Sequence, residues 1–567
     1  MTRATRLQPL TTQLVWNRLL AIVEEQAQTL MRTAFSTVVR EAGDLSAGVF
    51  DPHGRMLAQA VTGTPGHVNA MAASVGKFLQ RYPLDVLKPG DTLLTNDPWD
   101  GTGHLNDFTV VTPVYHHGRC VALFASTSHI ADVGGRGFGP DANDLFEEGL
   151  QIPISYLFRE GRRDETLMAI IARNVRDPVV AEGDLYSLAG CNDSGGRQLL
   201  EMLDDFGLSG LEQAGREILE TSQRAMLDEI ARLPHGDYHN RMRIDGYDEP
   251  VELVCRVGIR SDAILVDFAG TSPESPFGIN VPLPYTEAYA SFGVRCIVGN
   301  DVPNNAGSLA AVRVTAPPGC ILNARPPRAV SARHAIGQML PDVILGCLDQ
   351  VLPGRVPAEG ASCIWNPVFR NSHAASGGEE GDGKNGREHV SFVTNPIYNG
   401  GTGARPGKDG LSTTAFPSGV RTTPTEVNEV TAPLVIWRRE YRTDSGGAGE
   451  HRGGLGQIIE VAHRYGAPFV VSKMFDRVQH PARGRQGGDA GAPGRVYLRQ
   501  EAQPDVELRA KGRDEVPAGA TLVMESPGGG GMGDAANRDQ RLVRMDLEAG
   551  LISVEAARDR YGLPTAE

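Results

Sequence analysis

The chain has no apolar run long enough to cross a bilayer and no basic run interleaved with aromatic residues. The first absence argues against a membrane-spanning helix. The second, together with a formal net charge of -14, argues against nucleic acid and anionic membrane as partners. The basic N-terminus also lacks the apolar core and small-residue cleavage site of a secretory signal. We therefore expect a cytoplasmic protein that binds neither nucleic acid nor membrane.

Paired cysteines and a nucleotide-binding loop are missing as well. The seven cysteines are widely spaced and contain no CxxC pair, which predicts free buried thiols in a reducing compartment. Gly378 to Lys384 has Walker A spacing, but Asn385 stands where that motif needs Ser or Thr. The surrounding segment 372–388 is rich in glycine and charge without periodicity, so we interpret it as a mobile surface loop that binds no nucleotide.

Length and periodicity predict several subdomains. A chain of 567 residues with 40% hydrophobic and 22% charged content is globular but too long for one core. Helical spacing dominates residues 12–40 and 163–233, whereas strand-like alternation begins at 236. We expect a mixed α/β (α+β) fold in four parts: an N-terminal metal-site domain 1–235, a middle α/β domain 236–370, a Gly-rich, β-rich domain 371–535 and a helical tail 536–567.

The stretch from Asn96 to Gly135 has the pattern of a β-hairpin. Phe108 to Tyr115 and Cys120 to Thr127 are strand-like runs rich in Val, Thr and aromatic residues. Residues 116–119 between them have the chemistry of a tight turn. The polar residues that flank these two runs are therefore expected to meet at the open end of the hairpin.

Folding the chain about this turn pairs Asp107 roughly with Ser128 and brings His104, Asp107 and His129 together. Imidazole and carboxylate ligands suit Zn, Mn or Fe, and three protein ligands leave coordination positions open. Polar residues also gather at strand ends without any function, but this convergence favours a metal site. Because Asp107 stands at the mouth of the hairpin, we expect its removal to affect chemistry more than folding.

A second hairpin supplies a candidate fourth ligand. Leu45 to Phe50 and Met56 to Ala60 are joined by the turn sequence of residues 51–54. Asp44 ends this hairpin among small residues, as Asp107 ends the first. We therefore add Asp44 to the candidate metal ligands.

Four other residues are weaker candidates for contacts with the ligands or the substrate. His67 either faces substrate or is a loop histidine with its own partners. Asp132 either supports a ligand histidine or belongs to a strand-terminating loop. Glu148, an acid among apolar residues, either supplies general acid or base chemistry or lies on the surface. Arg452, within a glycine run, either meets an anionic intermediate or packs against a carboxylate.

The chain resembles the hydantoinase B/oxoprolinase family, the HyuB-like subunits of ATP-dependent N-methylhydantoinases, 5-oxoprolinases and caprolactamases, which are related to acetone and acetophenone carboxylase subunits. The resemblance runs from about Trp16 to Leu563. It is carried in order by EAGDLSAGVFDPHGRMLAQA, NDPWDGTGHLNDFTVVTPV, HIADVGG, EEGLQIP, DFAGTSP, GGTGARPGKDG, DSGGAGEHRGGLG, SPGGGGMGD and VEAARDRYGL. Two features depart from it: TGHLND stands where relatives often have a GTHLxD-like run, and the segment 372–388 looks like an insertion.

This resemblance implies a division of labour. A separate HyuA-like ATPase subunit would use ATP to phosphorylate the substrate carbonyl oxygen, and the activated species would pass to the HyuB-like subunit. A divalent metal, Zn or Mn and alternatively Fe, would be held there by residues matching His104, Asp107 and His129, with Asp44 added. We predict the metal-containing catalytic subunit of an ATP-dependent cyclic amide hydrolase, in a hetero-oligomer such as a dimer of heterodimers.

Two alternatives remain open at the level of sequence. The first is the corresponding subunit of an ATP-dependent ketone carboxylase, in which an activated enolate captures carbon dioxide. The second is a non-catalytic scaffold for the ATPase subunit, against which the intact set of His104, Asp107 and His129 argues.

Overall fold

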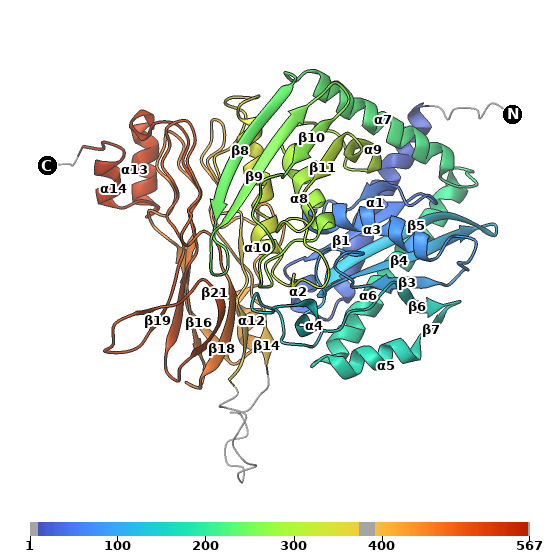
Figure 1. The fold of residues 1–567 in the computed structure, drawn as a ribbon, viewed down its shortest axis with the longest axis horizontal. Coiled ribbons are helices and arrows are strands. Elements are labelled where there is room, and N and C mark those ends of the chain that lie inside the picture. The colour runs from blue at the N-terminus through green and yellow to red at the C-terminus, as the bar shows by residue number, and fades with distance from the viewer. Residues whose placement is uncertain (1–8, 373–391, 565–567) are drawn as a thin grey trace, which may run out of the picture.

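The computed structural model describes residues 9–372 and 392–564 and has a mixed α/β fold with several sheets. In Figure 1 the blue and cyan N-terminal part and the orange C-terminal part lie on opposite sides of the view, with the green and yellow middle part between them. The loop predicted at 372–388 falls, apart from its first residue, outside the described residues.

A seven-stranded sheet forms the N-terminal part, in the order β2-β1-β5-β4-β3-β6-β7. Its neighbouring strands all run antiparallel. The strands are β1 (Leu45–Phe50), β2 (Met56–Gln59), β3 (Thr92–Thr95), β4 (Asp107–His116), β5 (Arg119–His129), β6 (Ser155–Arg159) and β7 (Arg162–Arg163). Both predicted hairpins, β1 with β2 and β4 with β5, are present.

Helices cover both faces of this sheet. They are α1 (Pro9–Thr33), α2 (Thr37–Arg40), α3 (Pro65–Arg81), α4 (Leu145–Glu148), α5 (Glu165–Asn174), α6 (Pro178–Asp205) and α7 (Glu212–Ala231). Val110 packs in a cluster with residues of α1 and α6, whereas its neighbour Val111 packs with residues of α3 on the other face. A strand buried on both faces needs apolar residues at consecutive positions, and this explains the unbroken Val-rich run in β4.

The helix predicted over residues 12–40 is divided between α1 and α2, with a break at residues 34–36. The side chain of Asp184, on α6, accepts the backbone N–H groups of Phe35 at 2.7 Å and Ser36 at 3.1 Å. A buried carboxylate thus takes donors that a continuous helix would use for its own ladder. The periodicity of residues 12–40 carries no information about Asp184, which is about 150 residues away in the sequence. The predicted helix therefore continued across the break.

The middle part contains a four-stranded sheet in the order β11-β10-β9-β8. Its elements are β8 (Gly236–Ile244), β9 (Val251–Ile259), β10 (Ile264–Asp267), α8 (Leu283–Arg295), α9 (Ala306–Leu309), β11 (Val312–Thr315), α10 (His334–Gly337) and α11 (Leu340–Leu348). Helix α11 packs against β8 and β9, and α8 lies between α11 and α3. The short helix α10 brings the segment 331–334 to the N-terminal sheet, where the site is built.

Strands of the C-terminal part form a two-stranded, a four-stranded and a five-stranded sheet: β12-β15, β14-β13-β18-β21 and β16-β17-β22-β19-β20. The elements are β12 (Ile364–Trp365), β13 (Val368–Asn371), β14 (Val393–Thr394), β15 (Tyr398–Asn399), α12 (Thr425–Thr431), β16 (Leu434–Tyr441), β17 (Gln457–His463), β18 (Phe469–Met474), β19 (Arg495–Arg499), β20 (Val506–Glu507), β21 (Lys511–Val516), β22 (Thr521–Glu525), the 3-10 helix η2 (Ala535–Asn537), α13 (Gln540–Glu548) and α14 (Val554–Asp559). The glycine runs pack backbone on backbone: a Cβ on Gly528 would lie 1.8 Å from the carbonyl oxygen of Ser445.

Three predictions about the whole chain can be compared with this fold. All seven cysteines are free, but Cys120 and Cys296 are only half-buried. Among the described residues, no helix has the length and apolar character that a bilayer crossing requires. The four-part division stays a prediction, because one hydrophobic cluster includes Phe138, Leu253 and Val471 from three of the four parts.

Candidate metal centre

The register of the β4–β5 hairpin places Asp107 directly opposite His129. The sequence prediction paired Asp107 with Ser128 and is wrong by one residue. The register shifts between Val114 and Tyr115: Val114 pairs with Ala122 while Tyr115 pairs with Cys120, which leaves Val121 as the extra residue of a bulge on β5. The extra residue on β5 brings the carboxylate and the imidazole to the same position at the end of the hairpin.

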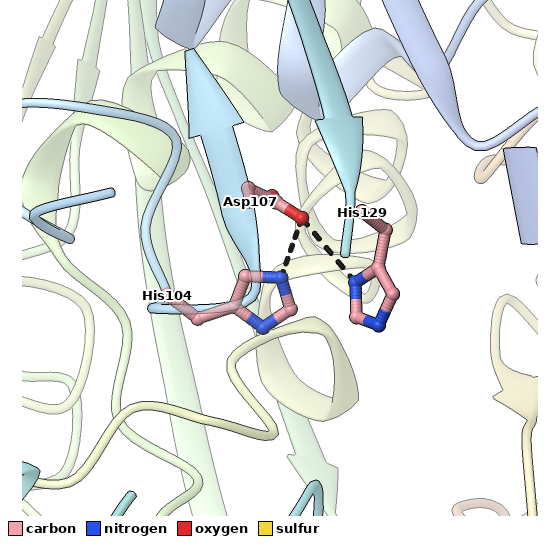
Figure 2. Close-up of side chains that lie close together, drawn as sticks. All are labelled: His104, Asp107 and His129. Carbon is pink, nitrogen blue, oxygen red and sulfur yellow. Dashed lines mark hydrogen bonds and ion pairs between the residues drawn. The ribbon is translucent and has the colours of Figure 1, made fainter. Parts of the chain in front are cut away.

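One carboxylate oxygen of Asp107 faces the two histidines (Figure 2). Its Oδ1 lies 2.7 Å from His104 Nε2 and 3.3 Å from His129 Nδ1. All three side chains are buried, and their three candidate ligand atoms lie within 4.8 Å of one another. The structure thus brings together the three residues that the hairpin argument selected.

The other oxygen of Asp107 is held by donors from three different segments. Its Oδ2 lies 2.9 Å from His67 Nε2, accepts the Thr102 hydroxyl at 2.9 Å and pairs with the Arg333 guanidinium. These contacts fix the carboxylate so that Oδ1 stays directed at the histidines. They also correct one expectation: Asp107 is fully buried, so its removal would leave Arg333 as an uncompensated buried charge and would also affect folding.

His104 is oriented from its far side. Its Nδ1 lies 2.9 Å from the carbonyl oxygen of Ser331. That carbonyl can only accept, so Nδ1 carries the hydrogen and Nε2 presents a lone pair toward Asp107. Burial, together with the charge of Arg333, lowers the pKa of His104 to about 4, which opposes a second proton on the ring at neutral pH.

A lone pair on His104 Nε2 therefore faces a carboxylate oxygen of Asp107 at 2.7 Å. Burial by itself would raise the pKa of Asp107, but the charges around it, among them that of Arg333, hold it well below its usual range, so this oxygen is anionic. At this distance the two atoms share either a proton or a metal ion. The residues present thus fit a divalent ion, and two imidazoles with one carboxylate suit Zn or Mn.

Asp44 and His67 lie next to this group. Asp44 Oδ1 accepts the Thr64 hydroxyl at 3.0 Å and lies 3.5 Å from His67 Nδ1. Burial would lower the pKa of His67, but Asp107 and Asp44 raise it above its ordinary value. Both residues line the same cavity as His104 and His129, although Asp44 is outside the group of three converging ligand atoms.

Glu148 is a buried acid rather than a surface one. Its Oε1 accepts the backbone N–H groups of Val330 at 2.7 Å and Ser331 at 2.8 Å, and its Oε2 has no partner among the described residues. Ser331 in turn contacts His104 through its carbonyl oxygen. Glu148 thus holds the segment that carries Arg333, and burial raises the pKa of this carboxyl to about 8.

The two remaining candidates have other partners. Asp132 pairs with Arg176 and accepts the backbone N–H of Gly134 at 3.1 Å. Arg452 donates to Asp546 Oδ2 at 3.1 Å, within the C-terminal part. Neither residue lines the cavity beside His104. From the sequence, a strand-terminating loop was one alternative for Asp132 and a carboxylate partner was one alternative for Arg452. The observed contacts agree with these two alternatives.

Sequence reasoning missed Arg333 and His334. Arg333 contacts Asp107, donates from Nε to the carbonyl oxygen of Thr102 at 2.9 Å and lies 4.1 Å above the Tyr285 ring. His334 lines the cavity, and burial beside Arg333 lowers its pKa to about 3. The available signal was an Arg-His pair within the otherwise small and apolar run AVSARHAIG.

A second group with metal-ligand chemistry lies at the opposite end of the same hairpin. His116, His117 and Asp204 also have candidate ligand atoms within 4.8 Å of one another. His116 Nε2 lies 3.2 Å from Asp204 Oδ1, and the two imidazole rings are 3.9 Å apart. This group is at the surface, with the Asp204 side chain 71% exposed.

Most of the chain matches a described protein family and several named proteins. The family model described as Hydantoinase B/oxoprolinase matches residues 8–535. Caprolactamase subunit beta of Pseudomonas jessenii is 28% identical, covering 98% of this chain and 96% of that protein. 5-Oxoprolinase 1 of Arabidopsis thaliana is 30% identical over 91% of this chain, which corresponds to only 41% of the longer protein.

Two solved structures share the fold. The crystal structure of ATP-dependent caprolactamase from Pseudomonas jessenii has a TM-score of 0.88 at 24% identity and covers 99% of this chain and 97% of its own. The nucleotide-free structure of acetone carboxylase has a TM-score of 0.86 at 18% identity and covers 98% of this chain and 79% of its own. At these identities the likeness concerns the fold alone.

Proposed function

Because the chain belongs to the hydantoinase B/oxoprolinase family, we propose that it is the metal-containing catalytic subunit of an ATP-dependent cyclic amide hydrolase. The observation that carries the proposal is the buried convergence of His104, Asp107 and His129, whose three candidate ligand atoms lie within 4.8 Å of one another. The named relatives that are caprolactamase and 5-oxoprolinase support the hydrolase class. The substrate would be a lactam or imide ring that a HyuA-like partner subunit has activated by phosphorylation.

His104, Asp107 and His129 would hold the divalent ion, with Asp44 as the candidate for a fourth ligand. When bound, the ion would supply a Lewis acid that lowers the pKa of water and stabilises developing negative charge. The chain's own residues prepare the site: Ser331 fixes the tautomer of His104, and Arg333 fixes the orientation of Asp107.

His67 is the side chain best placed to hold a proton in this site. It is buried between Asp107 and Asp44, and these carboxylates keep its pKa above the ordinary value. His67 would then be the group that donates a hydrogen bond to an oxygen on which charge develops during ring opening. Phe138, Ile397 and Val420 add apolar surface to the lining of the same cavity.

The test is ATP-dependent ring opening by this chain together with its ATPase partner. We expect products from a panel of lactams and hydantoins, about one divalent ion per chain, and no ATP turnover by this chain alone. Ring opening that continues after complete removal of the ion would contradict the proposal, as would strong ATP hydrolysis by the pure chain.

Acetone carboxylase shares the fold, so the ketone carboxylase alternative needs its own test. Labelled bicarbonate supplied with a ketone and ATP would leave the label in an acidic product if this chain served a carboxylase. We expect no incorporation, together with opening of cyclic amides in the same preparation.

A further inference from the structure

Arg370 on β13 and Arg513 on β21 reach from the C-terminal part to the loop that follows β5. They lie on the same face of their sheet, because they stand opposite Val470 and Ser472, alternate residues of the strand β18 between them. Arg370 Nη1 donates to the backbone carbonyl oxygen of Arg136 at 3.3 Å, and Arg513 Nη2 donates to the same oxygen at 3.1 Å. Two guanidinium groups thus converge on one neutral acceptor.

The segment that they contact also borders the cavity of the candidate metal centre. Arg136 is two residues before Phe138, which lines this cavity together with His104 and His129. The centroid of the Phe138 ring lies 5.6 Å from that of His104 and 5.1 Å from that of His129. A short stretch of chain therefore connects the arginine pair to the candidate metal ligands.

Two further guanidinium groups lie near the pair, and each has its own carboxylate partners. Arg136 pairs with Asp141 at 3.1 Å and with Glu147 at 2.9 Å. Arg176 pairs with Asp132. These three carboxylates are thus already engaged by other guanidinium groups.

Little negative charge is left for the pair itself. Arg513 Nη2 lies 3.7 Å from Asp141 Oδ1, and this carboxylate is shared. Glu515, on the same face of β21 as Arg513, accepts a serine hydroxyl at 2.8 Å. Arg370 forms no ion pair with a carboxylate among the described residues. Burial lowers the pKa of Arg370, and the charge of Arg513 lowers it further, as expected where positive charge is in surplus.

An anion from solution can reach both side chains. The Arg513 side chain is 25% exposed, and Arg370 is half-buried. A guanidinium fork binds the oxygens of phosphate or carboxylate through charge-assisted hydrogen bonds, which are stronger than a hydrogen bond to a neutral carbonyl. A phosphate group has enough acceptor oxygens and charge for two forks, so it would compete with the shared carbonyl of Arg136.

We propose that Arg370 and Arg513 form a binding site for an oxyanion of the phosphate class. The role of this site rests on the proposed function. Activation of a ring by phosphorylation supplies two such oxyanions, the phosphorylated substrate and the phosphate that it releases. Both arise beside the cavity that Phe138 lines, close to the segment that the two arginines contact.

Binding of inorganic phosphate to the full chain, measured by calorimetry, tests the site without any ring opening. We expect saturable binding at millimolar phosphate, weakened about tenfold in Arg370→Gln and in Arg513→Gln, the size of one hydrogen bond to a charged group. Arg224→Gln, exposed on α7, is the matched control and should bind like the unchanged protein. No binding by the unchanged protein, or equal affinity in all three variants, would overturn the site.

A conservative variant covers the case in which a glutamine variant does not fold. Arg370→Lys keeps the charge but loses the planar fork, so its affinity for phosphate should lie between those of Arg370→Gln and the unchanged protein. Loss of stability in the folded variants with phosphate affinity unchanged would show that the arginines only hold the loop, and would overturn the proposal.

Ring opening by the complex with the ATPase partner distinguishes the two sources of the phosphate group. If the phosphorylated substrate occupies the site, Arg370→Gln should increase the number of ATP molecules hydrolysed per ring opened. If released phosphate occupies it, this ratio should stay constant while inhibition by added phosphate weakens. A variant that changes neither quantity would overturn the role of the site in this reaction. Phosphate binding that depends on both arginines, in a complex that opens no ring, would refute the proposed function and leave the site standing.

Discussion

The two ends of the β4–β5 hairpin carry the same residue types in different surroundings. The buried end has His104, His129 and Asp107, and the exposed end has His116, His117 with Asp204 from α6. In both groups, candidate ligand atoms converge to within 4.8 Å. Ligand chemistry and proximity therefore do not distinguish the two ends.

The partners of each carboxylate do distinguish them. Asp107 is contacted by Thr102, His67 and Arg333 on the oxygen that faces away from the ligand pair. Asp204, by contrast, is 71% exposed, and its described side-chain contact is with His116. A ligand that other residues hold in place loses little freedom when an ion binds, whereas an exposed one must be ordered first. The comparison teaches that the supporting contacts, more than the ligand set, mark the functional end.

The largest expected effect comes from Asp107→Asn. We expect loss of ring-opening activity by about a thousandfold, because a neutral amide weakens the hold on a divalent ion and its electrostatic tuning. The same change leaves the buried Arg333 charge uncompensated, at a cost of about 3 kcal/mol in the free energy of unfolding. Activity and denaturant unfolding, measured on the complex and on the chain, would give the two values.

The matched control is Asp204→Asn at the exposed end, which should leave activity unchanged. His129→Gln separates activity from folding, since it removes a candidate ligand without freeing a buried charge. Normal activity of Asp107→Asn at full ion occupancy would remove the distinction between the two ends.

The second expected effect concerns ion content. Elemental analysis should give about one divalent ion per chain, lost in His104→Ala and retained in His117→Ala. The reason is that only the buried end pairs an anionic Asp107 oxygen with a lone pair held in place by Ser331. A second ion that disappears in His117→Ala would show that the exposed end also binds, and the comparison would then fail.

The sequence was sufficient to predict the hairpin and its three converging side chains, because alternating apolar strands and turn chemistry are local signals. It could not supply the bulge at Val121, which depends on pairing across the strands and decides that Asp107 meets His129 rather than Ser128. Nor could it supply Arg333, which reaches Asp107 across 226 residues of chain. Contacts between distant segments of this kind leave no periodic pattern.

The third effect is a pH dependence that belongs to the buried end. Burial raises the pKa of Glu148 from 4.5 to about 8, so the folded chain holds this proton more tightly than the unfolded chain. The stability that Glu148 contributes is full below pH 4.5 and is lost as the pH rises toward 8, by about 1.4 kcal/mol per unit. Glu148→Gln should remove this loss. The check is the free energy of unfolding, measured with denaturant at several pH values across that range.

The neighbouring acid provides the control for this experiment. Glu147 pairs with Arg136 at 2.9 Å at the surface, so Glu147→Gln should keep the pH dependence of the unchanged protein. If the free energy of unfolding changed with pH in the same way in Glu148→Gln and in the unchanged protein, the Glu148 carboxyl would not titrate in this pH range.

The smallest effect is expected at the exposed end itself. His117→Ala and Asp204→Asn should each change the free energy of unfolding by less than about 1 kcal/mol, because solvent replaces contacts of an exposed pair at little cost.

One feature there resembles the buried end: His116 Nδ1 is buried and has no partner among the described residues. Unfolding temperatures measured with and without added Zn²⁺ would show whether this nitrogen matters. We expect added Zn²⁺ to shift the unfolding temperature by the same amount in Asp204→Asn and in the unchanged protein. A single oriented imidazole beside two exposed ligands does not make a preorganised site. A zinc-dependent stabilisation that Asp204→Asn abolishes would mean that convergence of ligand types is enough, even without supporting contacts.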